Sequence, residues 1–122
     1  MTLFLGALSG LLAVALGAFG AHALAGRLGA DRMGWFQTGV QYQMTHSLAA
    51  LVAGGLVEAR LASPVALWGG GAFLGGIVLF SGSLYALALT GRRSLGAVTP
   101  VGGVFFLAGW ALLALGLLGA PR

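Results

Sequence analysis

The sequence contains no cysteine and no lysine, and only two of its 122 residues are acidic. The absence of cysteine excludes a disulfide scaffold, a thiol nucleophile and a thiolate metal site. Charged residues make up 7% of the chain, whereas a soluble domain has about 25%, so an ordinary cytosolic enzyme is excluded too. Because 59% of the residues are hydrophobic, disorder is excluded as well. These absences leave an integral membrane protein.

The positive charge is spread along the chain instead of being clustered. The net charge of +4 comes from six arginines set against Asp31 and Glu58. A protein that binds nucleic acid gathers basic residues on one face, so we expect no nucleic-acid partner. The arginines instead mark the loops between apolar segments, at Arg27, Arg32, Arg60, Arg92, Arg93 and Arg122.

Between these charges lie four long neutral segments, each of which is long enough to cross a bilayer. We expect membrane-spanning helices near residues 3–24, 35–56, 65–89 and 97–118. The connections are short, which predicts a single transmembrane domain over residues 1–122, an all-α, up-down-up-down four-helix bundle. The similarity of residues 20–30 to residues 82–97 also allows two tandem helical hairpins. A β-barrel is rejected because its strands would alternate apolar and polar residues.

The arginines also predict the orientation of the chain. Four of them lie in the first and third loops, namely Arg27, Arg32, Arg92 and Arg93, and the other two lie in the second loop and at the C-terminus. Since short cytoplasmic loops carry the excess of basic residues, both termini are expected outside the cytoplasm.

Glycine is the abundant small residue, with 23 copies. Helices associate in lipid through close packing of small residues, because lipid tails give them no hydrophobic driving force. We therefore expect a glycine face on each helix except the second, and a structural role for these glycines instead of a cofactor site. The predicted packing seam contains Gly6, Gly10, Gly17, Gly75, Gly82, Gly102, Gly109 and Gly116.

Polar side chains gather in the second expected helix and recur at similar depth in the others. From the basic end of the bundle, His22 lies roughly 5 Å deep, Gln41 and Tyr85 roughly 9 Å, and His46 roughly 16 Å. We expect a polar pocket or hydrogen-bond network between the hairpins, open toward the arginine loops, with His46 near its floor. Its candidate residues are His22, Gln37, Thr38, Gln41, Tyr42, Gln43, His46, Ser81, Ser83, Tyr85 and Thr99.

Three interpretations of these polar residues compete. The favoured one is structural, since intramembrane polar pairs hold helices together with about 0.6 kcal/mol each. The second is a proton or small-solute pathway that uses His22 and His46. The third is haem ligation by the two histidines, which their depth difference of about 11 Å opposes.

The residues for enzymatic chemistry are missing. Asp31 and Glu58 are expected at opposite sides of the membrane, so they cannot form a carboxylate pair. Ser47 adjoins His46 in sequence, but neighbours on a helix point about 100° apart. We therefore predict no catalytic residue, no metal site and no cofactor. Pro100 is expected in the first turn of the last helix, with Thr99 as its cap.

Four sequence motifs resemble a known family. They are LGAFGAHAL at residues 16–24, FQTGVQYQMTH at 36–46, LFSGSLY at 79–85 and LGAVTPVGG at 95–103. In this order they resemble the YgdD/YwdK-like family, small bacterial inner-membrane proteins of the domain of unknown function 423 class. The resemblance covers essentially the whole chain. It implies a four-span protein of the bacterial cytoplasmic membrane and supplies no catalytic residues.

These observations favour a non-enzymatic protein embedded in the lipid bilayer. Its glycine seams exceed what four helices need, which predicts a homo-oligomer or a place in a larger membrane complex. The alternative function is a pathway for protons or small solutes through the His/Gln/Tyr pocket.

Overall fold

The computed structural model describes all 122 residues and contains only helices and loops. The first helix, α1 (Thr2–Phe19), continues into a π-helical turn, η1 (Gly20–Leu24). The second, α2 (Ala30–Glu58), is uninterrupted. The third consists of α3 (Val65–Gly76), a π-helical turn η2 (Ile77–Ser81) and α4 (Gly82–Thr90) in direct succession. A short 3₁₀ turn, η3 (Arg93–Ala97), precedes α5 (Thr99–Leu118). The chain thus forms four helical rods.

Local sequence explains where the rods end. Gly91 adopts a left-handed conformation with φ of 71°, which glycine accepts without strain, and its N–H donates to the Leu87 carbonyl at 2.8 Å to close α4. Pro100 lies in the first turn of α5, as predicted, where its missing N–H costs nothing. The α5 helix has no side-chain cap, so the expected capping role of Thr99 is wrong.

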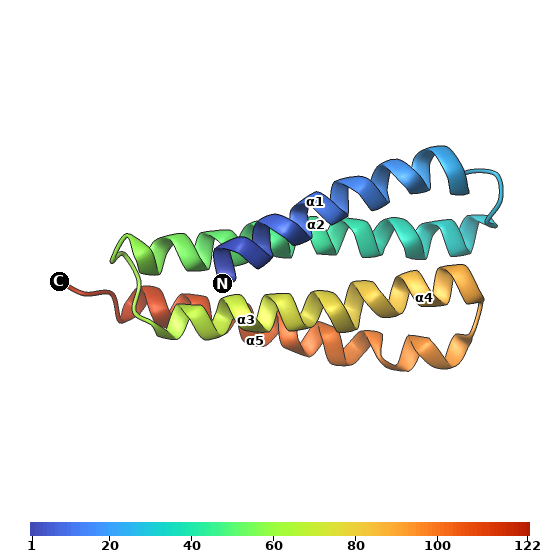
Figure 1. Ribbon diagram of the computed structural model, residues 1–122. Helices are drawn as coiled ribbons and strands as arrows, with labels where there is room; N and C mark the ends of the chain where they lie inside the picture. Colours follow the sequence, from blue (N-terminus) through green and yellow to red (C-terminus); the bar gives the residue numbers. More distant parts are fainter.

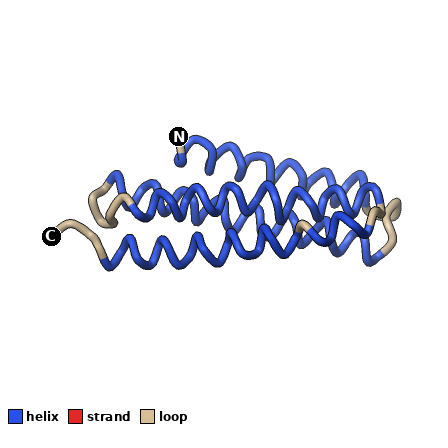
Figure 2. The backbone as a smooth tube through the Cα atoms, turned by 90° about the horizontal axis from the view of Figure 1, so that it is seen from below, coloured by secondary structure: helices blue, strands red, loops and turns tan.

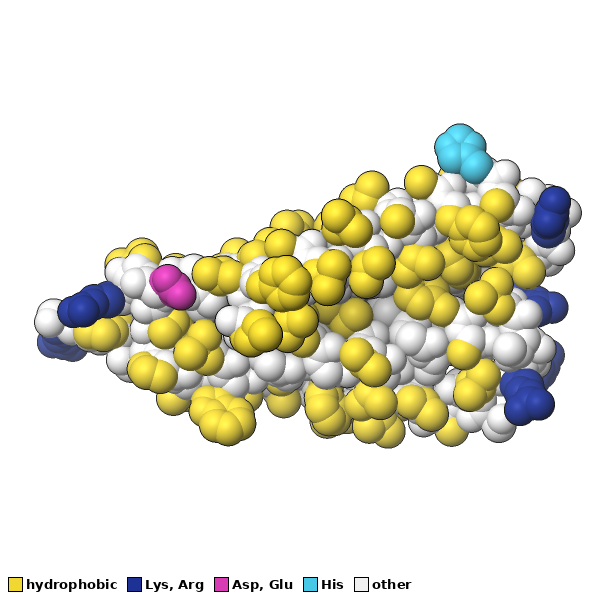
Figure 3. Space-filling model, in the orientation of Figure 1, with side chains coloured by type: hydrophobic (Ala, Val, Ile, Leu, Met, Phe, Trp, Pro, Cys, Tyr) yellow, Lys and Arg dark blue, Asp and Glu magenta, His cyan; other side chains and the backbone are white.

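The four rods lie side by side, with the loops at the two ends of the molecule (Figures 1 and 2). α1 packs along α2, and α3 packs along α5, while α2 also contacts α3, η2 and α4. Arginine side chains are found at both ends, with a broad hydrophobic band between them (Figure 3). This charge distribution suits a molecule whose ends face water and whose middle faces lipid.

Three of the four rods are long and apolar enough to cross a membrane, namely Thr2–Leu24, Val65–Thr90 and Arg93–Leu118. α2 has 29 residues but is not in this group. Its glutamine, threonine and serine side chains lower its hydropathy. The crossing expected over residues 35–56, which lie within α2, therefore stays a prediction.

The core is built from small residues and a few aromatic rings. Its main cluster contains five alanines, together with Phe73, Ile77, Phe106 and Leu113. Gly69 and Gly109 bring the backbones of α3 and α5 together, because a Cβ at Gly69 would lie 2.8 Å from the Gly109 carbonyl oxygen. Close backbone approach of this kind is the expected mode of helix association in lipid.

All but one of the glycines in the expected seam face another helix. These are Gly6, Gly10, Gly17, Gly75, Gly102, Gly109 and Gly116. Gly82 is the exception, since a Cβ there would meet nothing within 4 Å. The second helix, on which no glycine face was expected, also has close contacts at two glycines. A Cβ at Gly39 would lie 2.7 Å from the Tyr85 ring, and one at Gly54 would lie 2.9 Å from Leu3.

We predict that Gly102→Ala destabilises the protein whereas Gly82→Ala does not. A Cβ at Gly102 would lie 2.6 Å from Phe80 Cβ and 2.7 Å from its Cα, so α5 and η2 must separate. Overpacking of this kind costs about 1–3 kcal/mol. Both substitutions bring the same gain in helix propensity, which makes Gly82→Ala the matched control. Thermal unfolding in detergent measures both, and equal stability of the two variants would contradict the packing described here.

Candidate functional site

The polar side chains expected in one pocket fall into two groups in the structure. One group is buried or partly buried and hydrogen-bonded, and comprises Gln43, His46, Ser81, Ser83, Tyr85 and Thr99. In the other group no side chain forms a hydrogen bond, and all but the half-buried Thr38 are exposed: His22, Gln37, Thr38, Gln41 and Tyr42. The reason is helix geometry, because residues 41 and 43 point about 200° apart around α2. The candidate residues therefore do not share one pocket, whereas the first group forms interhelical hydrogen bonds, the other arrangement expected.

Gln43 is the centre of the interior network and is only 4% exposed. Its Nε2 donates to the Ser9 carbonyl at 3.0 Å, and its Oε1 accepts from the Tyr85 hydroxyl at 2.6 Å. One turn further along α2, Ser47 Oγ donates to the Gln43 carbonyl at 2.6 Å and lies 2.7 Å from Ser9 Oγ. One amide side chain therefore joins α1, α2 and α4.

Two further hydrogen bonds connect the remaining rods. Ser81, fully buried in η2, donates to the Gly39 carbonyl of α2 at 2.7 Å. This bond holds η2, the π-helical turn of the third rod, against α2. Ser83 Oγ and Thr99 Oγ1 lie 2.6 Å apart and join α4 to the start of α5. Thr99 thus serves a contact between helices in place of the cap expected from its position.

His46 is enclosed by aromatic rings and engaged at both nitrogens. Its ring stacks on Phe106 with centroids 3.6 Å apart. Nδ1 lies 2.8 Å from the Tyr42 carbonyl oxygen, and Trp110 Nε1 donates to Nε2 at 3.1 Å. A carbonyl only accepts and an indole N–H only donates, so Nδ1 carries the hydrogen and the imidazole is neutral. Neither nitrogen is left with a lone pair or a proton to offer to a ligand.

The sequence analysis missed three residues of this network. Ser9 and Trp110 were not among the candidates, and Ser47 was considered only as a nucleophile and not as a hydrogen-bonding group. Ser9 lies on the same side of α1 as Gly6 and Gly10 and contacts α2 there. The spacing of these two glycines therefore indicates that Ser9 faces another helix. Ser47 follows Gln43 by one helical turn. Nothing in the sequence relates Trp110 to His46, because their contact joins α2 to α5 across 64 residues.

The basic end of the molecule contains one further tertiary bond. Arg32, at the start of α2, donates from Nε to the Ala88 carbonyl near the end of α4 at 2.6 Å. This arginine was expected only as a topology marker, together with Arg27, Arg92 and Arg93, and in the structure it also joins the start of α2 to the end of α4.

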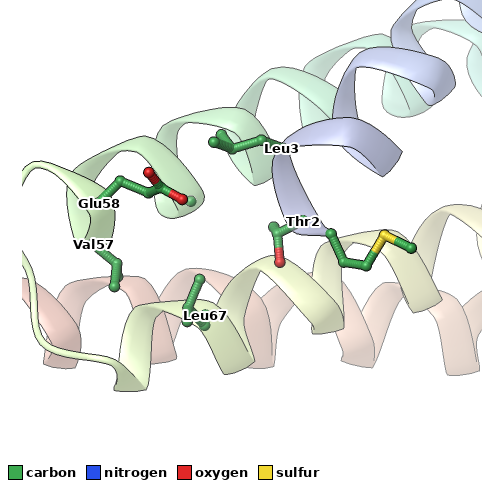
Figure 4. A pocket seen from close by; sticks show the side chains of 7 residues that line it. Thr2, Leu3, Val57, Glu58 and Leu67 are labelled. Atoms are coloured by element: carbon green, nitrogen blue, oxygen red, sulfur yellow. The ribbon is translucent and has the colours of Figure 1, made fainter.

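The largest depression lies at the opposite end of the molecule (Figure 4). It measures about 510 Å³ and is formed by the start of α1, the end of α2 and the start of α3. Apolar side chains such as Leu3, Val57 and Leu67 line it, and Glu58 is its one carboxylate. Glu58 is its only ionisable side chain, and the structure contains no group of three or more histidine, cysteine or acidic residues.

We predict that Gln43→Leu destabilises the fold by about 1–3 kcal/mol, because it leaves the buried Tyr85 hydroxyl without its acceptor. Gln41→Leu is the matched control. It makes the same change two residues away at an exposed side chain that forms no hydrogen bond. Thermal unfolding of the monomer in detergent should show the loss in Gln43→Leu alone. If both variants lose a similar amount of stability, the hydrogen bonds of Gln43 do not account for the loss, and the prediction is wrong.

Comparison with known proteins places this architecture among bacterial membrane proteins. The family model described as "Protein of unknown function (DUF423)" matches residues 16–103. The chain is 50% identical to the UPF0382 inner membrane protein YgdD of Escherichia coli (strain K12) over 121 residues, which cover 98% of this chain and 91% of the relative. It is also 47% identical to a UPF0382 membrane protein of Staphylococcus epidermidis over 116 residues, covering 95% of this chain and 93% of the relative.

No solved structure matches the chain. The relatives are uncharacterised membrane proteins, in agreement with the expected resemblance and with the apolar rods. With a family model that covers most of its length and relatives at half identity over nearly all of it, the chain belongs to the DUF423 family.

Proposed function

We propose that this protein crosses the bacterial cytoplasmic membrane four times as an up-down-up-down helical bundle and serves as a non-enzymatic partner in a membrane complex. α2 provides the fourth crossing, since it packs along α1 and along the rod of α3, η2 and α4, and both of these rods are apolar enough to span. The arginines of the first and third loops favour the cytoplasmic side for those loops, with both termini on the opposite side.

The observation that carries this proposal is the division of polar groups between interior and surface. Every buried side-chain nitrogen and oxygen has a hydrogen-bond partner within the chain. Gln41 and Thr45 form no side-chain hydrogen bond and lie exposed on α2, roughly 9 and 15 Å inside the expected span, where lipid supplies no partner. A polar group in hydrocarbon needs a partner, so a surface of this kind favours contact with another protein.

The same division disfavours a proton or solute pathway through the bundle. A pathway needs polar groups that exchange partners with water or solute, whereas Gln43, Ser47 and Tyr85 are bonded to one another or to Ser9. His46, the group best suited to a proton relay, is held between Tyr42 and Trp110. The interior groups therefore act as connections between helices.

We expect the purified protein in liposomes to conduct neither protons nor small solutes above the level of empty liposomes. In native membranes, after mild solubilisation, we expect it in particles larger than the monomer. A flux that His46→Ala abolishes while the fold persists would favour the pathway. A strictly monomeric protein that crosslinks to nothing in native membranes would contradict the partner role.

A further inference from the structure

The outward face of α2 has the residue spacing of a helix-pairing seam. Exposed or half-buried positions recur at alternating steps of four and three residues, the repeat of a left-handed coiled coil. They lie on the side of the helix opposite Gln43, which points inward to α1 and α4. This outward seam of α2 comprises Gly34, Thr38, Gln41, Thr45, Leu48 and Val52.

Three residues of the outward seam, Thr38, Gln41 and Thr45, are polar and form no side-chain hydrogen bond within the chain. Of these, Gln41 and Thr45 are exposed. They lie roughly 9 and 15 Å inside the expected span that starts at residue 35, which places Thr45 near the middle of a hydrocarbon core about 30 Å thick. Lipid tails offer them no partner there, whereas a second polypeptide that packs on the seam can supply one.

A second copy of the same chain supplies matching groups at the same depth. All copies insert in one orientation, so a two-fold axis between two of them runs along the membrane normal, and each residue near the axis faces its own counterpart. An amide both donates and accepts. Two Gln41 side chains can therefore exchange a pair of N–H···O bonds, and two Thr45 hydroxyls can pair one turn deeper.

The surroundings permit such an approach. A Cβ at Gly34 would meet nothing within 4 Å, so the backbone is open at the end of the seam near the basic loops. The seam carries no charged residue, which removes repulsion between copies. Toward the other end it continues in Leu48 and Val52, which are 54% and 51% exposed and would pack against their counterparts.

We propose that the protein forms a parallel homodimer through the outward seam of α2, with reciprocal Gln41 amide bonds setting its register. This inference rests on the proposed partner role and names the partner as a second copy. A single polar residue within an apolar seam is a known means of fixing register in paired helices.

Single-cysteine crosslinking tests this dimer directly, because the chain has no cysteine of its own. Leu48→Cys on the seam should form an intermolecular disulfide on mild oxidation of the full chain in native membranes. Leu107→Cys is the matched control, since Leu107 is 72% exposed on α5, away from the seam. Adding Gln41→Leu to Leu48→Cys should lower the crosslinked fraction about tenfold, with thermal stability of the monomer in detergent unchanged.

Other crosslinking results would contradict the dimer. Some of them would contradict the proposed function as well, and others would leave it standing. Equal crosslinking at the two cysteine positions would mean random encounters and no seam. If Gln41→Leu leaves the crosslinked fraction unchanged, the Gln41 amide does not set the register of the dimer. If position 48 crosslinks to a different protein and never to itself, the homodimer is wrong while the partner role stands. If position 48 crosslinks to nothing and the protein runs as a monomer, both are wrong.

Discussion

The hydrocarbon core of a bilayer contains no water to pair with a polar group, and the arrangement of this molecule depends on that constraint. A buried hydrogen-bonding group has to find its partner within the protein or in another protein. Gln43 meets this requirement by joining three helices at once, through Ser9 and Tyr85. Ser81 and His46 meet it by bonding across to Gly39 and Trp110. The interior polar groups therefore position the helices relative to one another.

Close packing of small residues brings the helices near enough for these bonds. Gly39 has no side chain, so the Tyr85 ring can lie against α2 and its hydroxyl can reach Gln43. Gly102 does the same for η2, where the backbone of Phe80 lies against α5. Burial of large side chains contributes less here than in a soluble protein, because lipid is as apolar as leucine. The glycines and the polar bonds thus depend on each other.

The sequence predicts the all-helical class and most of the glycine contacts of the first, third and fourth rods, because lipid imposes simple rules on length and side-chain size. It singles out Gln43 and His46, which form hydrogen bonds to other helices, and it misses their partners Ser9 and Trp110. It does not predict their pairing, since Trp110 and His46 meet only when α5 lies against α2. A shared depth suggested one pocket, but depth says nothing of direction around a helix. Gln41 and Gln43 share a depth and point to opposite sides, and that difference separates the surface of α2 from the interior.

Because every buried side-chain nitrogen and oxygen has a partner within the chain, we expect the interior of the bundle to be dry. The most direct test is the reactivity of single cysteines toward a water-soluble maleimide in sealed proteoliposomes. Ser47→Cys and Ser81→Cys replace side chains that are 1% and 0% exposed, and Ser94→Cys marks an exposed position in the third loop. We expect label at position 94 and none at 47 or 81 from either side of the membrane until the protein is denatured. Labelling of 47 or 81 in the folded protein at a rate close to that of position 94 would mean that water enters the bundle and that its interior is not dry.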